Sequence, residues 1–244
     1  LKYVSALKDE APPHITVDYQ IAEQTNTFYF NRGAMKNFGA LQKIQSRQQL
    51  HNSILVFHDV DIRLNNLKLS DYLTRPGLVK HFYGYRNLLG GVFSIHSRDF
   101  FRINGFPNFW GWGWEDNVIF QRCLGAGITV DRSLFIPAAQ GLPDHRIELA
   151  MEDRKLLSLP CINRYVNRNI DGVSDLSSLR HKFLSDDHLV VDLFTTKFAC
   201  PALLVPLDVR SCIRKYGSWS SIIERLKELY NQLLSRGLDD KKQI

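Results

Sequence analysis

The strongest constraint on the fold is a short apolar run that stops at two carboxylates. Residues 53–57 read Ser-Ile-Leu-Val-Phe, and His-Asp-Val-Asp follows directly at residues 58–61. A continuous apolar run of this length predicts a strand covered on both faces, and open α/β sheets bind ligands at the carboxyl edge of their strands. Alternate side chains of an extended strand share a face. If the chain stays extended, Asp59 and Asp61 are therefore expected to point the same way and to offer oxygens to one divalent cation.

Composition places the chain among ordinary globular proteins. Its 244 residues, 44% hydrophobic and 23% charged, suit one substantial α/β domain with appendages. No run of eighteen apolar residues predicts a membrane span, and the first residues do not resemble a signal peptide. The formal charge of +6 suits anionic ligands such as nucleotide diphosphates, and equally an ordinary basic surface. Basic residues are dispersed and the aromatic cluster lies among acids, so no nucleic-acid partner is expected.

Hydrophobic spacing outlines the elements around this run. Residues 15–22 read as a short strand, and residues 32–49 carry apolar positions at helical spacing. Near the end of the chain, residues 218–237 predict a helix with an apolar stripe. Such a stripe usually packs on its own domain, and a contact with a partner or a membrane surface is the alternative. The four cysteines show no CxxC pair, which disfavours a metal cluster.

A second segment places aromatic rings and acids together. Residues 110–117 read Trp-Gly-Trp-Gly-Trp-Glu-Asp-Asn, and apolar positions at helical spacing follow. Glycines permit loop motion, and indoles offer flat faces with a polar N–H that suit sugar rings, so a closing loop is a reasonable expectation. Glu115 and Asp116 fall at the predicted helix start, where a capping role is the plain alternative. For Trp110 alone, a place in the core is favoured.

At this point the chain resembles the beta-1,4-galactosyltransferase family of metal-dependent, inverting enzymes that use UDP-sugars. Six segments carry the resemblance in the family's order, namely residues 30–32 (FNR), 57–61 (FxDVD), 90–92 (GGV), 103–108 (INGFPN), 110–116 (WGWGxED) and 171–176 (like DGLNSL). The resemblance implies an α/β fold of the GT-A type, a Rossmann-like nucleotide-sugar-binding fold with a mixed central sheet. We expect a catalytic domain over residues 1–194 and a C-terminal helical extension over 195–244. The family's first strand would precede Leu1, so a missing N-terminal strand is also expected.

The resemblance also implies roles for individual residues. Asp116 would be the catalytic base, with Glu115 holding sugar hydroxyls beside it. Mn²⁺ or Mg²⁺ would be held by Asp61 and His145. Donor and nucleotide contacts would come from Phe30, Arg32, Asp59, Val60, Asp61 and Trp112, and acceptor contacts from Tyr85, Gly91, Trp112, Asp116 and Asn117.

Departures from the family pattern leave several alternatives open. Leu142 stands where the family has a methionine ligand, and Asn117 replaces an acceptor-binding aspartate. A UDP-sugar donor and a glycan acceptor are expected, with galactose as the sugar and GalNAc, glucose or xylose as alternatives. A catalytically inactive carbohydrate-binding or structural relative is the non-enzymatic alternative. The resemblance suggests the Golgi lumen, whereas a bacterial or viral relative would be cytoplasmic; the oligomeric state is open.

Overall fold

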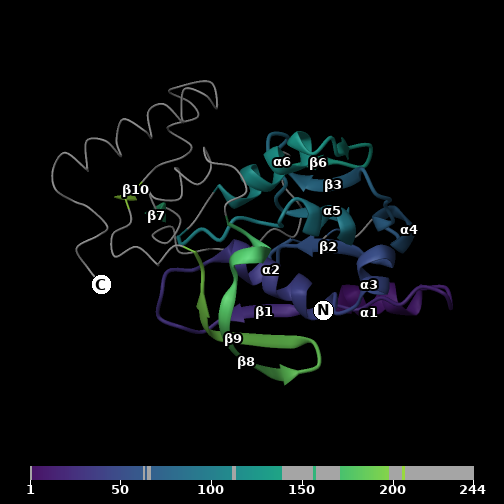
Figure 1. Ribbon diagram of the computed structural model, residues 1–244. Helices are drawn as coiled ribbons and strands as arrows, with labels where there is room; N and C mark the ends of the chain where they lie inside the picture. Colours follow the sequence, from purple (N-terminus) through teal and green to yellow (C-terminus); the bar gives the residue numbers. More distant parts are fainter. Residues whose placement is uncertain are drawn as a thin grey trace.

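A computed structural model shows a mixed sheet with helices around it and a second, smaller sheet beneath (Figure 1). It describes residues 2–62, 64, 67–111, 114–138, 156–157, 171–197 and 205–206. Among these residues no helix has the length and apolar character needed to cross a bilayer.

The central sheet has the strand order β2-β4-β3-β5. Its strands are β2 (Ile54–His58), β3 (Leu78–Gly84), β4 (Val92–His96) and β5 (Thr129–Asp131), and β6 (Ile136–Pro137) extends the pairing of β3. β4 runs antiparallel to both neighbours, whereas β5 and β6 run parallel to β3. The sheet is therefore mixed, as predicted.

The strand predicted over residues 53–57 is confirmed as β2, with one correction. It lies at the edge of the described sheet rather than inside it, and Val56 is 43% exposed. Its buried face carries Phe57, whose ring lies 5.0–5.2 Å from the rings of Phe93, Phe100 and Phe106. This aromatic cluster forms the centre of the main core and fixes where β2 ends.

Helices surround the sheet, and one predicted helix is found as two. The helix expected over residues 32–49 is divided into α2 (Arg32–Lys43) and α3 (Arg47–Asn52). The break follows from a capping box, in which the Ser46 hydroxyl accepts a bond from the Gln49 N–H and the Gln49 side chain accepts one from the Ser46 N–H. The other helices are α1 (Lys2–Asp9), α4 (Leu69–Tyr72), α5 (Ser97–Arg102), α6 (Glu115–Gly125) and the short η3 (Val173–Asp175).

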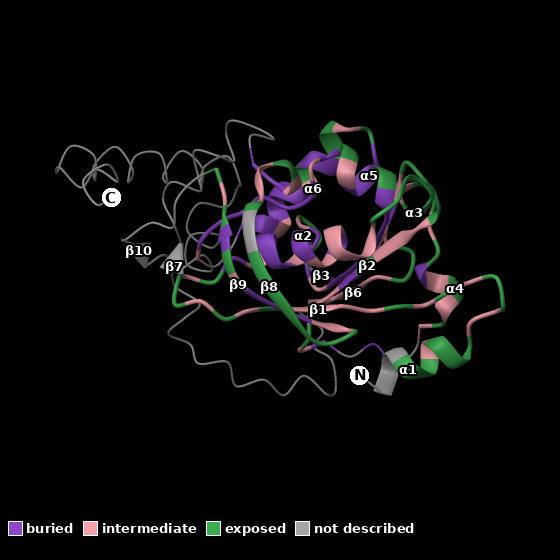
Figure 2. Cartoon of the chain, turned by 60° about the horizontal axis from the view of Figure 1, so that its bottom comes forward, coloured by how far each residue is buried: buried purple, intermediate pink, exposed green. Residues whose placement is uncertain are grey.

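A second sheet brings distant parts of the chain together beside α2. Its order is β1 (Ile21–Gln24), β9 (His188–Thr195), β8 (Ser177–Ser185), with β1 parallel to β9. The strand predicted over residues 15–22 was therefore placed too early. Figure 1 shows α2 between the two sheets. Figure 2 shows many buried residues along α2, whereas β8 is mostly exposed. The core here comprises Ala34, Met35, Phe38, Trp110, Leu189, Val191 and Phe194.

The end of the chain is described only at one short pair. β10 (Val205–Pro206) runs antiparallel to β7 (Leu156–Leu157). The helix predicted over residues 218–237 lies outside the described residues, so the division into residues 1–194 and 195–244 stays a prediction.

Candidate active site

Arg32 joins the predicted acidic residues into one cluster. It is the first residue of α2, which Asn31 caps by accepting a bond from the Ala34 N–H through its side chain. Its Nη2 donates to both carboxylate oxygens of Asp59 at 2.6 Å, and its Nη1 donates to both oxygens of Asp116 at 2.8 Å and to Glu115. The structure thus assembles three carboxylates from two segments around one guanidinium.

Lys36 adds a second cation that the sequence did not single out. It lies one helical turn after Arg32, and its Nζ is 3.3 Å from Asp59 Oδ1 and 3.6 Å from Asp116 Oδ1. The same ammonium lies 4.8 Å from the centroid of the Phe106 ring. The i, i+4 spacing from Arg32 was the available signal, because residues four apart share one face of a helix. The cluster therefore contains three carboxylates and two cationic side chains.

Burial and charge shift the acids in opposite directions. Burial alone would raise the pKa of Asp59, but the charges of Lys36 and Arg32 outweigh it and hold that pKa well below its usual range. Burial dominates at Glu115 and raises its pKa, although Arg32 partly offsets this. For Arg32, burial works against the charged form, and the three neighbouring carboxylates nevertheless raise its pKa. Asp59 is therefore the firmly ionised member.

The chain does not stay extended across the two aspartates of the DxD segment. The Asp59 N–H donates to the carbonyl of Gly91 at 3.0 Å, which ties the end of β2 to the start of β4. A turn follows at once, closed by a bond from the Ile62 N–H to the Asp59 carbonyl at 3.1 Å. The extended chain on which the predicted shared face depended is therefore not found here. Val60 at the tip is 95% exposed, and Asp61 forms no ion pair with any described residue.

The predicted helix start at Glu115 and Asp116 is confirmed, and its first turn sits against the glycine pair. Trp114 precedes α6 with a φ of 75°, a left-handed conformation, and Glu115 is buried. The Asp116 carbonyl accepts a bond from the Leu89 N–H at 2.9 Å. The Asp116 carboxylate lies over Gly90 so closely that a Cβ there would meet Oδ2 at 2.3 Å. A residue without a side chain is thus required beneath this carboxylate.

A buried polar network supports the cluster from behind. The side chain of Asn37 in α2 donates to the Phe106 carbonyl at 2.9 Å and accepts from the Phe106 N–H at 3.0 Å. Asn108 receives a bond from Asn37 and donates its own N–H to Asp171. Arg122 of α6 donates to the carbonyls of Gly105 and Asp171 and pairs with the Asp171 carboxylate at 3.3 Å. The segments at residues 104–108 and 171–176 therefore hold α2 and α6 in place.

The remaining predicted residues are described in part. Phe30 and Tyr85 are half exposed, and the side-chain amide of Asn117 donates to the Asn87 carbonyl at 3.3 Å. Gly91 adopts a φ of 74°, which suits glycine. Trp112 and His145 lie outside the described residues. Among the residues that the structure describes, no group of three His, Cys, Asp or Glu side chains is arranged to hold a metal.

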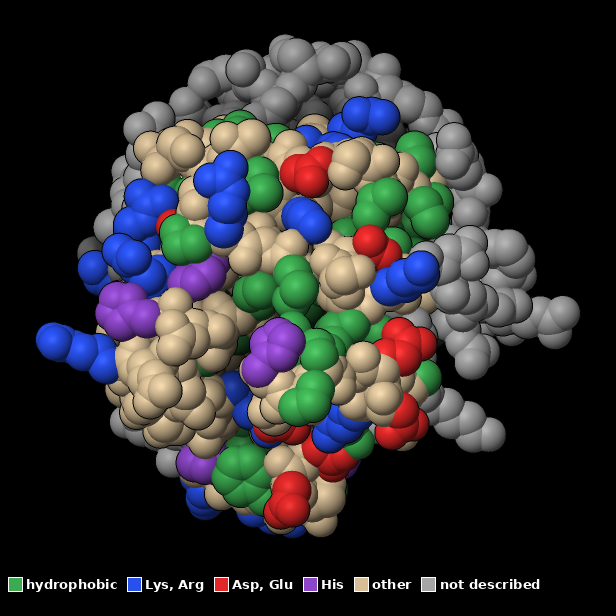
Figure 3. All heavy atoms as spheres, turned by 90° about the vertical axis from the view of Figure 1, so that its right-hand side faces the viewer, with side chains coloured by type: hydrophobic (Ala, Val, Ile, Leu, Met, Phe, Trp, Pro, Cys, Tyr) green, Lys and Arg blue, Asp and Glu red, His purple; other side chains and the backbone are tan. Residues whose placement is uncertain are grey.

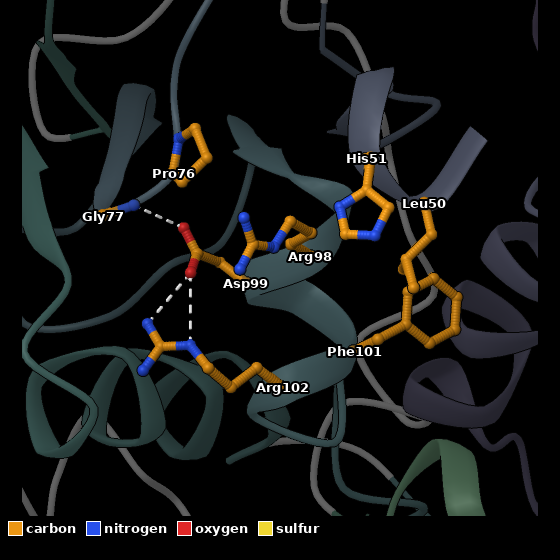
Figure 4. A pocket seen from close by; sticks show the side chains of 8 residues that line it. All are labelled: Leu50, His51, Pro76, Gly77, Arg98, Asp99, Phe101 and Arg102. Carbon is orange, nitrogen blue, oxygen red and sulfur yellow. Dashed lines mark hydrogen bonds and ion pairs between the residues drawn. The ribbon is translucent and has the colours of Figure 1, made fainter. Parts of the chain in front are cut away.

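A separate hollow of about 570 Å³ lies away from this cluster, at the opposite ends of the strands (Figure 4). Its walls come from the two residues before β3, from α3 and from α5, and it contains none of the predicted site residues. Its buried carboxylate, Asp99, already accepts bonds from the Gly77 N–H at 2.6 Å and from Arg102 at 2.9 Å. The face shown in Figure 3 carries basic and acidic side chains with apolar ones between them.

Comparison with known proteins finds galactosyltransferases that are similar to part of this chain. Residues 78–142 match the family described as the N-terminal domain of galactosyltransferase. Beta-1,4-galactosyltransferase 6 of Mus musculus is 34% identical over 125 residues, 47% of this chain and 31% of that protein. Beta-1,4-galactosyltransferase 7 of Drosophila melanogaster is 28% identical over 183 residues, 70% of this chain and 55% of that protein. The match thus spans about a third of the first of these relatives and about half of the second.

Solved structures show the same fold. The catalytic domain of Drosophila beta1,4galactosyltransferase 7 in complex with xylobiose aligns with a TM-score of 0.56 at 18% identity, covering 81% of this chain and 87% of that one. A mutant of that enzyme in complex with manganese, UDP-Gal and xylobiose aligns with a TM-score of 0.51 at 16% identity and the same coverage. The predicted α/β fold of the GT-A type is confirmed, and so is the predicted resemblance.

Proposed function

We propose that this chain, which is similar to beta-1,4-galactosyltransferases, is an inverting glycosyltransferase that uses a UDP-sugar. The observation that carries the proposal is the cluster of Asp59, Glu115 and Asp116 around Arg32, at the end of β2. A nucleotide-sugar site needs cations for the diphosphate and a carboxylate for the acceptor proton. This cluster provides both, and they are in direct contact.

Asp116 is the proposed base. The acceptor hydroxyl oxygen attacks the anomeric carbon, the bond from that carbon to the diphosphate oxygen breaks, and its electron pair leaves with UDP. The hydroxyl proton passes to Asp116, and attack opposite the leaving group inverts the configuration. One carboxylate is sufficient, because the diphosphate leaves as a stabilised anion and needs no acid.

The cluster also indicates how the base is controlled. Both oxygens of Asp116 accept bonds from Arg32, which engages the electron pairs that a proton would use. A diphosphate is a competing anion for the same guanidinium. We therefore expect Arg32 to turn toward the donor and to free one oxygen of Asp116 for the acceptor.

A divalent metal fits this site in its donor chemistry. Asp61 is a carboxylate without an ion pair among the described residues, and hard oxygen ligands suit Mn²⁺ and Mg²⁺. Asp61 and His145 would hold the ion, and its role when bound is to neutralise charge on the departing diphosphate. A solved relative contains manganese and UDP-Gal, which supports Mn²⁺ and galactose as the first choices here.

The acceptor side is proposed from the same relative. Its complexes contain xylobiose, so a hydroxyl of a glycan is the expected acceptor. Tyr85, Gly91 and Asn117 are the proposed acceptor contacts, with Trp112 as the predicted ring that touches both sugars. UDP-GalNAc, UDP-glucose and UDP-xylose are the alternative donors, and a carbohydrate-binding protein without turnover is the alternative function.

The test is UDP release from a panel of UDP-sugars with xylobiose, with Mn²⁺ present or chelated. We expect metal-dependent release from UDP-Gal that Asp61→Ala reduces to background. The matched control is Asp186→Ala, an exposed carboxylate at the turn between β8 and β9. Release from another donor alone would correct the sugar. Binding of xylobiose without release from any donor would favour the non-catalytic alternative.

A further inference from the structure

Two arginines meet over one aromatic ring on the flank of the site. The guanidinium carbon of Arg86 lies 5.4 Å from the centroid of the Phe135 ring, and that of Arg132 lies 5.7 Å from it. Arg132 also lies 5.3 Å from the Phe120 ring, and its Nη2 donates to the Arg86 carbonyl at 2.7 Å. Stacking on aromatic faces fixes the planes of both guanidinium groups.

These two cations have no counter-ion among the described residues. No carboxylate of the described chain lies within ion-pair distance of either arginine. Asp131, although next in sequence to Arg132, turns its carboxylate to the Ser133 N–H at 2.8 Å. Like charges held together are unfavourable unless an anion joins them. The pKa of Arg132 is accordingly lowered by burial and by the neighbouring charge of Arg86.

The pair is joined to the acceptor side of the site. Arg86 follows Tyr85 directly and precedes Asn87, whose carbonyl accepts the bond from Asn117. Four residues farther on, Gly90 lies beneath the Asp116 carboxylate. Four residues of extended chain span at most about 14 Å, so Arg86 stands within a few sugar units of the base.

A buried histidine links the pair to that glycine. Arg132 Nε donates to His81 Nδ1 at 3.3 Å, so His81 Nε2 carries the proton and donates to the carbonyls of Gly90 and Tyr83, both at 3.0 Å. The Arg132 side chain is thereby anchored on one side. Its Nη1 and the whole exposed guanidinium of Arg86 form no hydrogen bond to any described residue.

We propose that Arg86 and Arg132 form a binding site for an anionic group, a carboxylate or a sulfate, carried by the acceptor glycan beyond the sugar that receives the transfer. The proposal rests on the proposed function for its choice of ligand. Paired guanidinium groups match the two-oxygen geometry of carboxylate and sulfate, and such charge-assisted bonds are stronger than those to neutral hydroxyls. The acceptor is therefore acidic, and a neutral glycan is the poorer substrate.

The experiment compares xylobiose with xylobiose that carries a single glucuronate or a single sulfate. With the complete chain, Mn²⁺ and UDP-Gal, we expect kcat/KM for an acidic acceptor to exceed that for xylobiose by about tenfold, as for one charge-assisted contact. Arg86→Gln, at an exposed position, is expected to remove most of this preference while leaving the neutral acceptor nearly unchanged. The preferred anion identifies which group the site takes.

Arg98→Gln is the matched control, because Arg98 is an exposed arginine in the hollow at the opposite ends of the strands. Equal loss in both variants, or a preference that Arg86→Gln leaves intact, would overturn the proposal. Direct binding of the glucuronate-bearing xylobiose, measured by NMR titration with UDP present, needs no turnover. Binding that depends on Arg86 without any transfer would uphold this site and refute the proposed function, whereas transfer without acidic preference would do the reverse.

Discussion

Two arginines of this protein bind carboxylates in different surroundings, one partly buried and one buried. Arg32 faces three carboxylates, with 20% of its side chain exposed, whereas Arg122 is 5% exposed and meets one carboxylate and several backbone carbonyls. Around Arg32 the carboxylates outnumber the cations and lie next to solvent. An entering ligand can therefore replace a carboxylate as the partner of Arg32. The second arginine, Arg122, joins α6 to residues 104–105 and to Asp171 and so stabilises the fold. A buried arginine indicates a site when its partners are side chains open to replacement.

The largest effect should come from the cluster around Arg32. Asp116→Asn keeps the size of the side chain but removes its proton acceptor, so transfer should fall by roughly 10²- to 10⁴-fold. UDP binding should persist, because Asp59 and Glu115 still face Arg32. Initial rates and UDP titration check this. Loss of UDP binding in parallel with transfer would mean that Asp116 holds the donor instead.

The network around Arg122 should respond in stability. Arg122→Met leaves the Asp171 carboxylate buried without its cation, which should cost about 3–5 kcal/mol of unfolding free energy. Arg180→Met, which breaks the exposed pair with Asp192, should cost at most about 1 kcal/mol. Urea unfolding of both variants measures the difference. Equal costs would show that the buried pair has no special part in the fold.

The buried side chain of His81 should make the stability of the fold depend on pH. Burial lowers its pKa to about 4 from 6.5, so the unfolded chain binds the proton first as the pH falls. Its contribution is complete above pH 6.5 and is lost as the pH falls toward 4, by roughly 3 kcal/mol in total. Unfolding free energies across this window, in the wild type and in His81→Gln, should show the slope only in the former. A slope of the same size in the variant would assign it to other groups.

Gly90 offers the smallest and most local change. In Gly90→Ala the new Cβ would lie 2.3 Å from Asp116 Oδ2 and force the carboxylate aside, which should lower kcat by about 100-fold. Gly125→Ala in α6, where a Cβ meets nothing within 4 Å, is the control. Steady-state kinetics of both separate displacement of the base from a general effect of added methyl groups.

The sequence predicted local features well and tertiary ones only through the resemblance. β2 and the start of α6 follow from apolar spacing and from acids at a helix N-terminus. The position of Asp61 does not follow, because a turn replaces the extended chain after Asp59. Lys36 was missed because a lysine at helical spacing usually faces solvent, and only the fold sets carboxylates from two other segments against it. The pairing of residues 104–108 with residues 171–176 joins segments too far apart for any local pattern.

The parallel pairing of β1 with β9 has a consequence for how the molecule forms. Ile21 lies opposite His188 in this pairing. The strand that completes the packing around α2 is β9, which is among the last described parts to leave the ribosome. Contacts between such distant segments form slowly, since closing a long loop precedes any gain from them. Until then α2 lacks the cover of Leu189, Val191 and Phe194 and presents Met35 and Phe38 to water. The nascent chain is therefore expected to need a chaperone, or another protein that covers these apolar side chains, until β9 is made.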